Sequence, residues 1–210
     1  MKKHKFNLPE QGLTEREKAN LIKKAEKYYS KYMSVLLPGW ENDPNSKDTP
    51  HRVTKAFVED IAKGLYTAFP KITSFDNIDK YSGIVLQSNI PVRSFCSHHH
   101  QNIYGIAHVA YIPSSDGKII GLSKLNRIVS YYAQAPGVQE NLTQQIHDAV
   151  SEICENNKGV AVIIKAKHMC VGHRGVNHDS DMSTAVLSGD FKADQKVRDE
   201  FYKLVEYSLK

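Results

Sequence analysis

The sequence predicts an α+β protein whose strands pair in an antiparallel fashion. Two strand-like runs follow one another closely at residues 83–95 and 103–112, with the spacing of a hairpin. A pair of helical segments then lies between Ser123 and Ile153, and two further strand-like runs come after it, at 159–166 and near 184–187. Strands on both sides of a helical pair, joined by short connections, are typical of this class.

The N-terminal part reads as two helices. Thr14 and Glu17 have the spacing of a capping box, which opens a helix that extends to about Leu36. A loop rich in Pro, Gly, Asn and Asp follows at 38–46, and a second helix begins at Asp48-Thr49-Pro50, where the proline suits the first turn. Apolar residues repeat along these helices and predict buried faces. They are Leu21, Ile22, Ala25, Tyr29 and Tyr32 on the first helix, and Val53, Phe57, Ile61 and Leu65 on the second.

Turn and cap residues divide the rest of the chain. A turn is expected at 114–117, and Ser123 is expected to cap a helix that Pro136-Gly137 ends. A closing helix is expected from Asp194 to Leu209. The helical faces to be buried carry Leu125, Ile128, Val129 and Tyr132, and then Val138, Leu142, Ile146, Val150 and Ile153. We divide the chain into an N-terminal helical extension, 1–47, and a second domain, 48–210.

Composition limits the class of protein. The chain has 210 residues, of which 40% are hydrophobic and 24% charged, as is ordinary for a globular protein. No apolar run has membrane-spanning length, and the start of the chain lacks the apolar stretch of a signal peptide. We therefore expect a cytoplasmic protein without a membrane partner.

The net charge of +5 suits an anionic partner without identifying one. Much of it comes from the chain start (Lys2, Lys3, Lys5) and the first helix (Lys18, Lys23, Lys24, Lys27, Lys31), which we interpret as a solvated face. Because no basic stretch is interleaved with aromatic residues, we expect no nucleic-acid partner.

Two short segments contain candidate metal ligands. Cys96-Ser97-His98-His99-His100 offers a thiol and an imidazole at chelating spacing, and His168-Met169-Cys170 offers a second thiol. Two sulfurs and one imidazole make three protein ligands, the number found in catalytic zinc sites that keep a fourth position open. The alternative is that the histidines form a solvated turn and that both cysteines are ordinary buried thiols. A Cys96–Cys170 disulfide is a further alternative if the metal is lost, and we interpret Cys154 as a core residue.

The chain resembles GTP cyclohydrolase I from about Thr14 to Leu209. The motifs that carry this resemblance agree in order and interval. They are Asp48-Thr49-Pro50-His51-Arg52-Val53, Cys96-x-His98-His99, residues 107–113 (AHVAYIP), residues 121–129 (GLSKLNRIV), residues 138–146 (VQENLTQQI), His168-x-Cys170 and Arg174-Gly175-Val176. The resemblance implies the tunnelling fold, in which antiparallel sheets from several subunits of a homo-oligomer, typically a decamer, join into a barrel.

The resemblance also implies an activity. This is zinc-dependent hydrolysis of the guanine imidazole ring of GTP at C8, with release of formate and formation of 7,8-dihydroneopterin triphosphate. Such a product would feed folate, pterin or 7-deazaguanine synthesis. No organic cofactor is expected.

Site residues carry over motif by motif. Cys96, His99 and Cys170 become the zinc ligands, and His98 and His168 the acid–base residues, since histidine titrates near neutral pH. Glu140 becomes the guanine-recognising carboxylate, and Gln139 beside it a further substrate-binding residue. The positions that contact the triphosphate are Arg52, Lys55, Ser123, Lys124, Arg127 and Arg174.

Four residues depart from the family pattern near these motifs. Ser97 replaces a glutamate, His100 an apolar residue and Gly137 a larger polar residue, while His173 is an unusual histidine after Cys170. Changes around a metal site alter ligand orientation and affinity. Two alternative hypotheses follow. One is a divergent zinc hydrolase that only opens the ring or acts on another guanine nucleotide. The other is a non-catalytic nucleotide-binding or structural oligomer.

Overall fold

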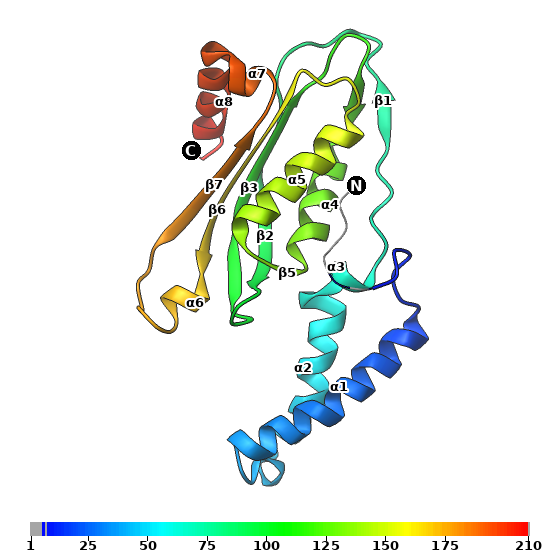
Figure 1. Ribbon diagram of the computed structural model, residues 1–210, viewed down its shortest axis with the longest axis vertical. Helices are drawn as coiled ribbons and strands as arrows, with labels where there is room; N and C mark the ends of the chain where they lie inside the picture. The colour runs from blue at the N-terminus through cyan, green and yellow to red at the C-terminus, as the bar shows by residue number, and fades with distance from the viewer. Residues whose placement is uncertain (1–5, 7, 210) are drawn as a thin grey trace. The chain divides into compact units, whose positions relative to one another are not determined.

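The computed structural model describes residues 6 and 8–209, which form two compact units that divide between Phe69 and Pro70 (Figure 1). The basic residues at 2, 3 and 5 lie outside the described part of the chain. The division differs from the predicted boundary at 47/48 because the helix that begins at Thr49 packs against the first helix. As a functional boundary, 47/48 stays a prediction.

Within the described residues, no helix is both long and apolar enough to span a membrane.

The N-terminal unit contains α1 (Glu15–Leu36) and α2 (Thr49–Ala56). The predicted capping box is confirmed: the Thr14 amide donates to Glu17 at 2.7 Å, and the Glu17 amide donates to Thr14 Oγ1 at 3.3 Å. The short elements of this unit are η1 (Trp40–Asn42), the π-helical η2 (Phe57–Ile61) and α3 (Lys63–Tyr66).

The predicted apolar face of the second helix is wrong. Val53 and Ile61 are exposed, and the buried side carries Pro50, Thr54 and Val58 in their place. Of the other two predicted residues, Leu65 is buried as expected and Phe57 is half-buried. The helix passes into the π-helical η2, whose wider turn changes which residues share a face. On α1, Ile22 is buried as predicted but Tyr32 is exposed.

The second unit is built on a five-stranded sheet, which confirms the α+β prediction with antiparallel pairing of the long strands. Its order is β5-β2-β3-β6-β7, and the three pairs formed by its long strands, β2–β3, β3–β6 and β6–β7, are all antiparallel. The strands are β2 (Val85–Cys96), β3 (Asn102–Ile112), β5 (Pro136–Gly137), β6 (Gly159–His168) and β7 (Asp181–Leu187).

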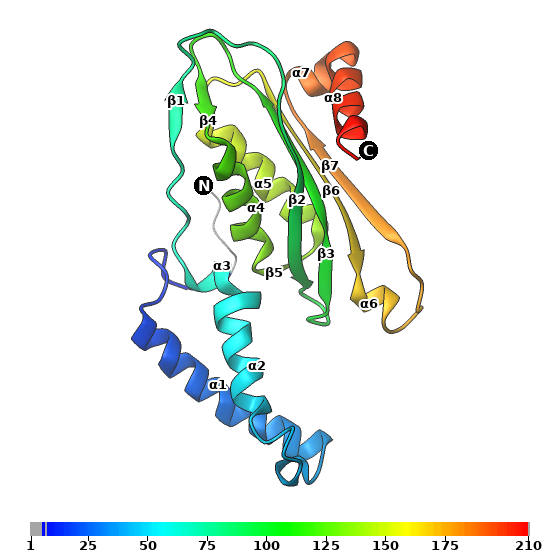
Figure 2. The same ribbon diagram turned by 180° about the vertical axis from the view of Figure 1, so that it is seen from behind.

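Helices cover both faces of this sheet (Figures 1 and 2). On one face lie α4 (Leu122–Ala133) and α5 (Gln139–Ile153), with Ile128, Val129 and Ile146 fully buried. On the other lie α7 (Asp190–Ala193) and α8 (Gln195–Tyr207), whose Phe191 and Phe201 pack edge to face at 5.2 Å. Two alternating sets of strand side chains therefore fill two apolar layers, each fully buried side chain contributing about 1.5–3 kcal/mol.

Three local features differ from the sequence expectation. The N-cap of α4 is Gly121, so Ser123 lies inside the first turn and does not cap it. A small two-stranded sheet of β1 (Ser74–Asp76) and β4 (Lys118–Ile120) was not predicted, because each strand has three residues and no alternating pattern. Pro136-Gly137 does end the helix as predicted, but it also forms β5, which pairs parallel with β2.

The buried histidine of β3 gives a pH-dependent prediction. His108 is 2% exposed, its Nδ1 has no hydrogen-bond partner, and burial lowers its pKa below 6.5. As pH falls below about 6.5 the unfolded chain binds a proton at this ring sooner than the folded protein does, so stability is lost. We therefore expect His108→Leu to gain stability relative to the wild type as pH falls from about 7.5 to 5, by at most about 1.4 kcal/mol per pH unit.

Denaturant unfolding of both proteins at one fixed protein concentration measures this difference. Titrations at the metal-ligand cluster are common to both proteins and cancel in the comparison. A stability difference that does not change with pH would contradict the assignment of His108 as a buried neutral ring.

Candidate metal centre and nucleotide site

The three predicted ligands come from two chain segments that meet at one end of the sheet. Cys96 is the last residue of β2, and His99 lies in the tight turn to β3, which the Cys96 amide closes by donating to Gln101 O at 2.8 Å. Cys170 is the second residue of α6 (Met169–Gly172), directly after β6. Because β3 pairs with both β2 and β6, the sheet brings the turn and α6 together.

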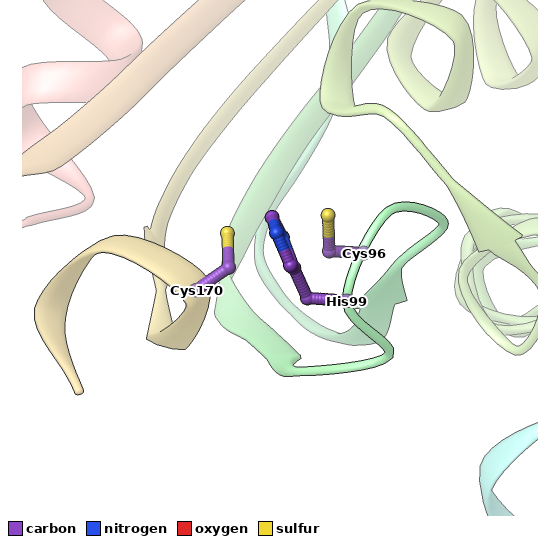
Figure 3. A group of neighbouring side chains, drawn as sticks. All are labelled: Cys96, His99 and Cys170. Carbon is purple, nitrogen blue, oxygen red and sulfur yellow. The ribbon is translucent and has the colours of Figure 1, made fainter. Parts of the chain in front are cut away.

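The donor atoms of Cys96, His99 and Cys170 all lie within 4.8 Å of one another. Figure 3 shows the His99 ring between the two thiols, with all three side chains directed to the same side. Cys96 is buried, Cys170 is partly buried and His99 is exposed, so the cluster is open on one side. Two thiols and an imidazole at this separation are a donor set that fits zinc with a position left for a further ligand.

The three cysteines of the chain have different surroundings. Burial, together with the neighbouring Cys96 sulfur, raises the pKa of the Cys170 thiol, and Arg174 opposes that shift. Burial raises the pKa of Cys154 to about 12, and its thiol donates to Lys118 O at 2.9 Å. Cys154 is thus an inert core thiol, as expected, and is separate from the cluster.

His98 lies beside the cluster. Its amide donates to Cys96 Sγ at 3.4 Å, and its Nδ1 is 3.6 Å from the same sulfur. The ring is exposed, so it is accessible to a molecule bound next to the three donors.

His168 ends β6 and is directed to the start of α5. Its Nε2 lies 2.8 Å from Gln139 Oε1. Burial lowers the pKa of His168, while the Glu140 carboxylate acts in the opposite direction. Glu140 itself is exposed in the first turn of α5, where the helix dipole favours a carboxylate.

Gln139 is 1% exposed and its amide group is held by protein atoms on both ends. The two N–H bonds of Nε2 face three acceptors, Ile164 O at 3.0 Å and Met182 O and Thr184 Oγ1 at 3.1 Å. Thr143 completes this network, 2.6 Å from Thr184 Oγ1 and donating to Gln139 O at 2.7 Å. Neither threonine was singled out from the sequence as a site residue.

Two of the predicted phosphate-contacting residues, Ser123 and Lys124, lie at the end of α4 that is remote from β5. The C-terminal end of α4 leads into β5, which pairs with Cys96, whereas Ser123 and Lys124 are in the first turn. Ten residues of helix separate the two ends, about 15 Å along the axis. Lys124 and Arg127 are three residues apart and share a helix face, as predicted.

The remaining predicted cations are divided between the two units. Arg174 follows α6, and its Nη1 donates to Cys170 O at 3.4 Å, so it belongs to the cluster's surroundings. Arg52 and Lys55 lie on α2 in the N-terminal unit, where Arg52 is 3.5 Å from Asp48 and Lys55 is 3.8 Å from Glu59. A phosphate contact for any of them stays a prediction.

The four departures from the family pattern surround the cluster. The Ser97 amide donates to Gly137 O at 3.1 Å, and the His100 amide donates to Cys96 O at 2.9 Å. His100 has a φ of 52° and its ring meets Phe95 edge to face at 5.7 Å, while His173 is exposed at the end of α6. A Cβ at Gly137 would meet no atom within 4 Å, so packing does not require a glycine there.

Comparison with known proteins identifies relatives across most of the chain. The family model described as GTP cyclohydrolase I matches residues 29–206. The chain is 44% identical over 185 residues to GTP cyclohydrolase 1 of Wigglesworthia glossinidia brevipalpis, covering 87% of this chain and 83% of that protein. It is 42% identical over 201 residues to GTP cyclohydrolase 1 of Vibrio parahaemolyticus, covering 92% and 91%. A solved dihydroneopterin aldolase from Burkholderia thailendensis overlaps 54% of this chain at 10% identity and a TM-score of 0.37, too distant to support an argument.

Proposed function

The chain belongs to the GTP cyclohydrolase I family and is an enzyme of that class. From this premise we propose that it hydrolyses the guanine ring of GTP with a zinc ion held by Cys96, His99 and Cys170. The observation that carries the proposal is the convergence of two thiols and one imidazole within 4.8 Å, beside two further histidines. When bound, zinc would supply a Lewis acid that lowers the pKa of water to near neutrality.

The protein's own groups would select and orient the base. The Glu140 carboxylate can accept hydrogen bonds from N1–H and from the exocyclic amine of guanine together, which adenine does not offer in that arrangement. A site built on such donors rejects an analogue that lacks them, because its charged acceptor would be left unpaired.

His168 and His98 would move protons at the reacting ring. Opening the imidazole ring at C8 requires a proton on the departing ring nitrogen, and a histidine titrating near neutral pH suits that transfer. A second hydrolysis then releases formate. An Amadori-type rearrangement of the ribose and ring closure would give 7,8-dihydroneopterin triphosphate for a folate, pterin or 7-deazaguanine pathway.

Binding of the triphosphate favours a homo-oligomer, which we propose to be a decamer whose sheets join into a barrel. The first turn of α4, with Ser123 and Lys124, lies about 15 Å along the helix from the end that leads to β5 and Cys96. These residues are therefore better placed to contact a triphosphate bound at the metal cluster of a neighbouring subunit. Among the described strands, β7 pairs only with β6 and leaves one edge of the sheet open to pairing with another chain. The cations proposed for phosphate are Arg52, Lys55, Ser123 (through its hydroxyl and the helix start), Lys124, Arg127 and Arg174.

We also propose a cytoplasmic location, because the ligand cysteines must stay reduced to bind metal. The departures at Ser97, His100, Gly137 and His173 favour one second candidate, an enzyme that opens the ring without completing the pterin.

The direct test incubates zinc-loaded protein with GTP and follows formate together with the fluorescent oxidised pterin. We expect both products in equal amounts. Formate or ring-opened product without pterin would support the second candidate, and binding without turnover would refute catalysis.

A further inference from the structure

Gln139 is the residue whose contacts the proposed reaction does not yet use. It stands next to Glu140 in the sequence, but its side chain is buried against β6 and β7. Its hydrogen bonds are to protein atoms, and one of them is to His168, a proposed acid–base residue.

The network fixes which end of the Gln139 amide meets His168. Its Nε2 group faces two main-chain carbonyl oxygens, Ile164 O and Met182 O, which can only accept hydrogen bonds. Turning the amide over would bring Oε1 against both carbonyl oxygens and the NH₂ group against the ring. The amide carbonyl therefore faces His168.

The threonine hydroxyls agree with this orientation. Thr143 donates to Gln139 O, so Thr184 donates to Thr143. Thr184 Oγ1 then faces Gln139 Nε2 as an acceptor and shares the two N–H bonds with the two carbonyl oxygens. Each hydroxyl then donates once and accepts once, which leaves neither proton without an acceptor.

We propose that Gln139 is a positioning residue that holds a proton on Nε2 of His168 and leaves Nδ1 as the nitrogen that exchanges protons with the substrate. An amide oxygen accepts but cannot donate, so the Nε2 atom 2.8 Å away carries the hydrogen of this bond. Among the described residues, no hydrogen-bond partner of His168 Nδ1 is found. The role of His168 in proton transfer rests on the proposed function. The position of the proton on Nε2 rests only on the contact with Gln139.

The proposal separates Gln139 from direct guanine recognition. A buried amide whose two ends are held by protein atoms acts on the reaction through His168. Its loss should reduce kcat and leave KM for GTP and the preference for GTP over ATP unchanged, whereas loss of a guanine contact would change both.

The first experiment locates the proton without any turnover. Zinc-loaded protein carrying ¹⁵N-labelled histidine is measured by solid-state NMR, and the His168 signals are identified by their loss in His168→Asn. We expect the Nε2–H form for the neutral ring, and a neutral ring with hydrogen on Nδ1 would overturn the proposal. This result does not depend on whether the protein turns over GTP.

The second experiment compares Gln139→Met with Thr184→Val. Both variants remove hydrogen bonds from the same buried network, but only Gln139→Met removes the acceptor at His168. We expect Gln139→Met to lower kcat by about 10- to 100-fold at unchanged KM and zinc content, and Thr184→Val to lose thermal stability with kcat near that of the wild type. Equal losses of kcat in the two variants, or a normal kcat in Gln139→Met, would refute a positioning role.

The two experiments keep the inference distinct from the proposed function. Absence of GTP turnover in the wild type would refute the function while the NMR result stands. Normal turnover together with hydrogen on Nδ1 would refute the inference alone.

Discussion

Replacing Cys170 by alanine is expected to abolish zinc retention and to lower activity by at least about 1,000-fold, while the oligomer stays assembled. The variant leaves only Cys96 and His99, and two ligands do not hold a catalytic zinc that normally has three. The Lewis acid that the reaction needs is then lost. Zinc content after dialysis against a mild chelator, formate release and size-exclusion chromatography measure the three outcomes.

Cys154→Ala is the matched control for this experiment. It removes a thiol from the same chain, but one that is buried in the core and donates to Lys118 O. We expect this variant to retain zinc and activity with a loss of stability. Full zinc occupancy in Cys170→Ala, or loss of zinc in both variants, would contradict the ligand assignment.

The second large effect is expected for Glu140→Gln. The amide keeps the size of the side chain but has one acceptor oxygen and one donor group, so it can pair with only one of the two guanine donors. We expect kcat/KM for GTP to fall by about 100-fold, with a smaller preference for GTP over ATP. Steady-state kinetics with both nucleotides under identical conditions measure this change.

Glu152→Gln removes the same charge from the other end of α5 and serves as the control. We expect it to leave discrimination between GTP and ATP as in the wild type. Unchanged discrimination in Glu140→Gln would refute the role of Glu140 in guanine recognition.

Much of the fold could be predicted because its signals are local. The capping box at Thr14, the four long strands and the helical faces of α4 and α5 all follow from short-range patterns of polar and apolar residues. The errors arose where tertiary structure overrides such patterns. The π-turn of η2 moves the buried face of the second helix, and β5 is a strand of two residues that exists only because β2 lies beside it.

The candidate site was likewise predictable only in part. The cysteines and histidines were found from their spacing. His99 and Cys170 are 71 residues apart in the sequence, and they meet because β3 pairs with both β2 and β6. The environment of Gln139 could not be predicted, because its partners Ile164 O and Met182 O are main-chain atoms that carry no sequence signal. Nothing in the sequence indicated that Ser123 and Lys124 lie at the opposite end of α4 from β5, which pairs with Cys96.

Zinc K-edge X-ray absorption on the reduced, zinc-loaded protein tests the central claim most directly. We expect two sulfur ligands at about 2.3 Å and two nitrogen or oxygen ligands at about 2.0–2.1 Å, with one sulfur lost from any metal that remains bound to Cys170→Ala. A shell of four sulfurs, a shell without sulfur, or protein that takes up no zinc on reconstitution would contradict the account.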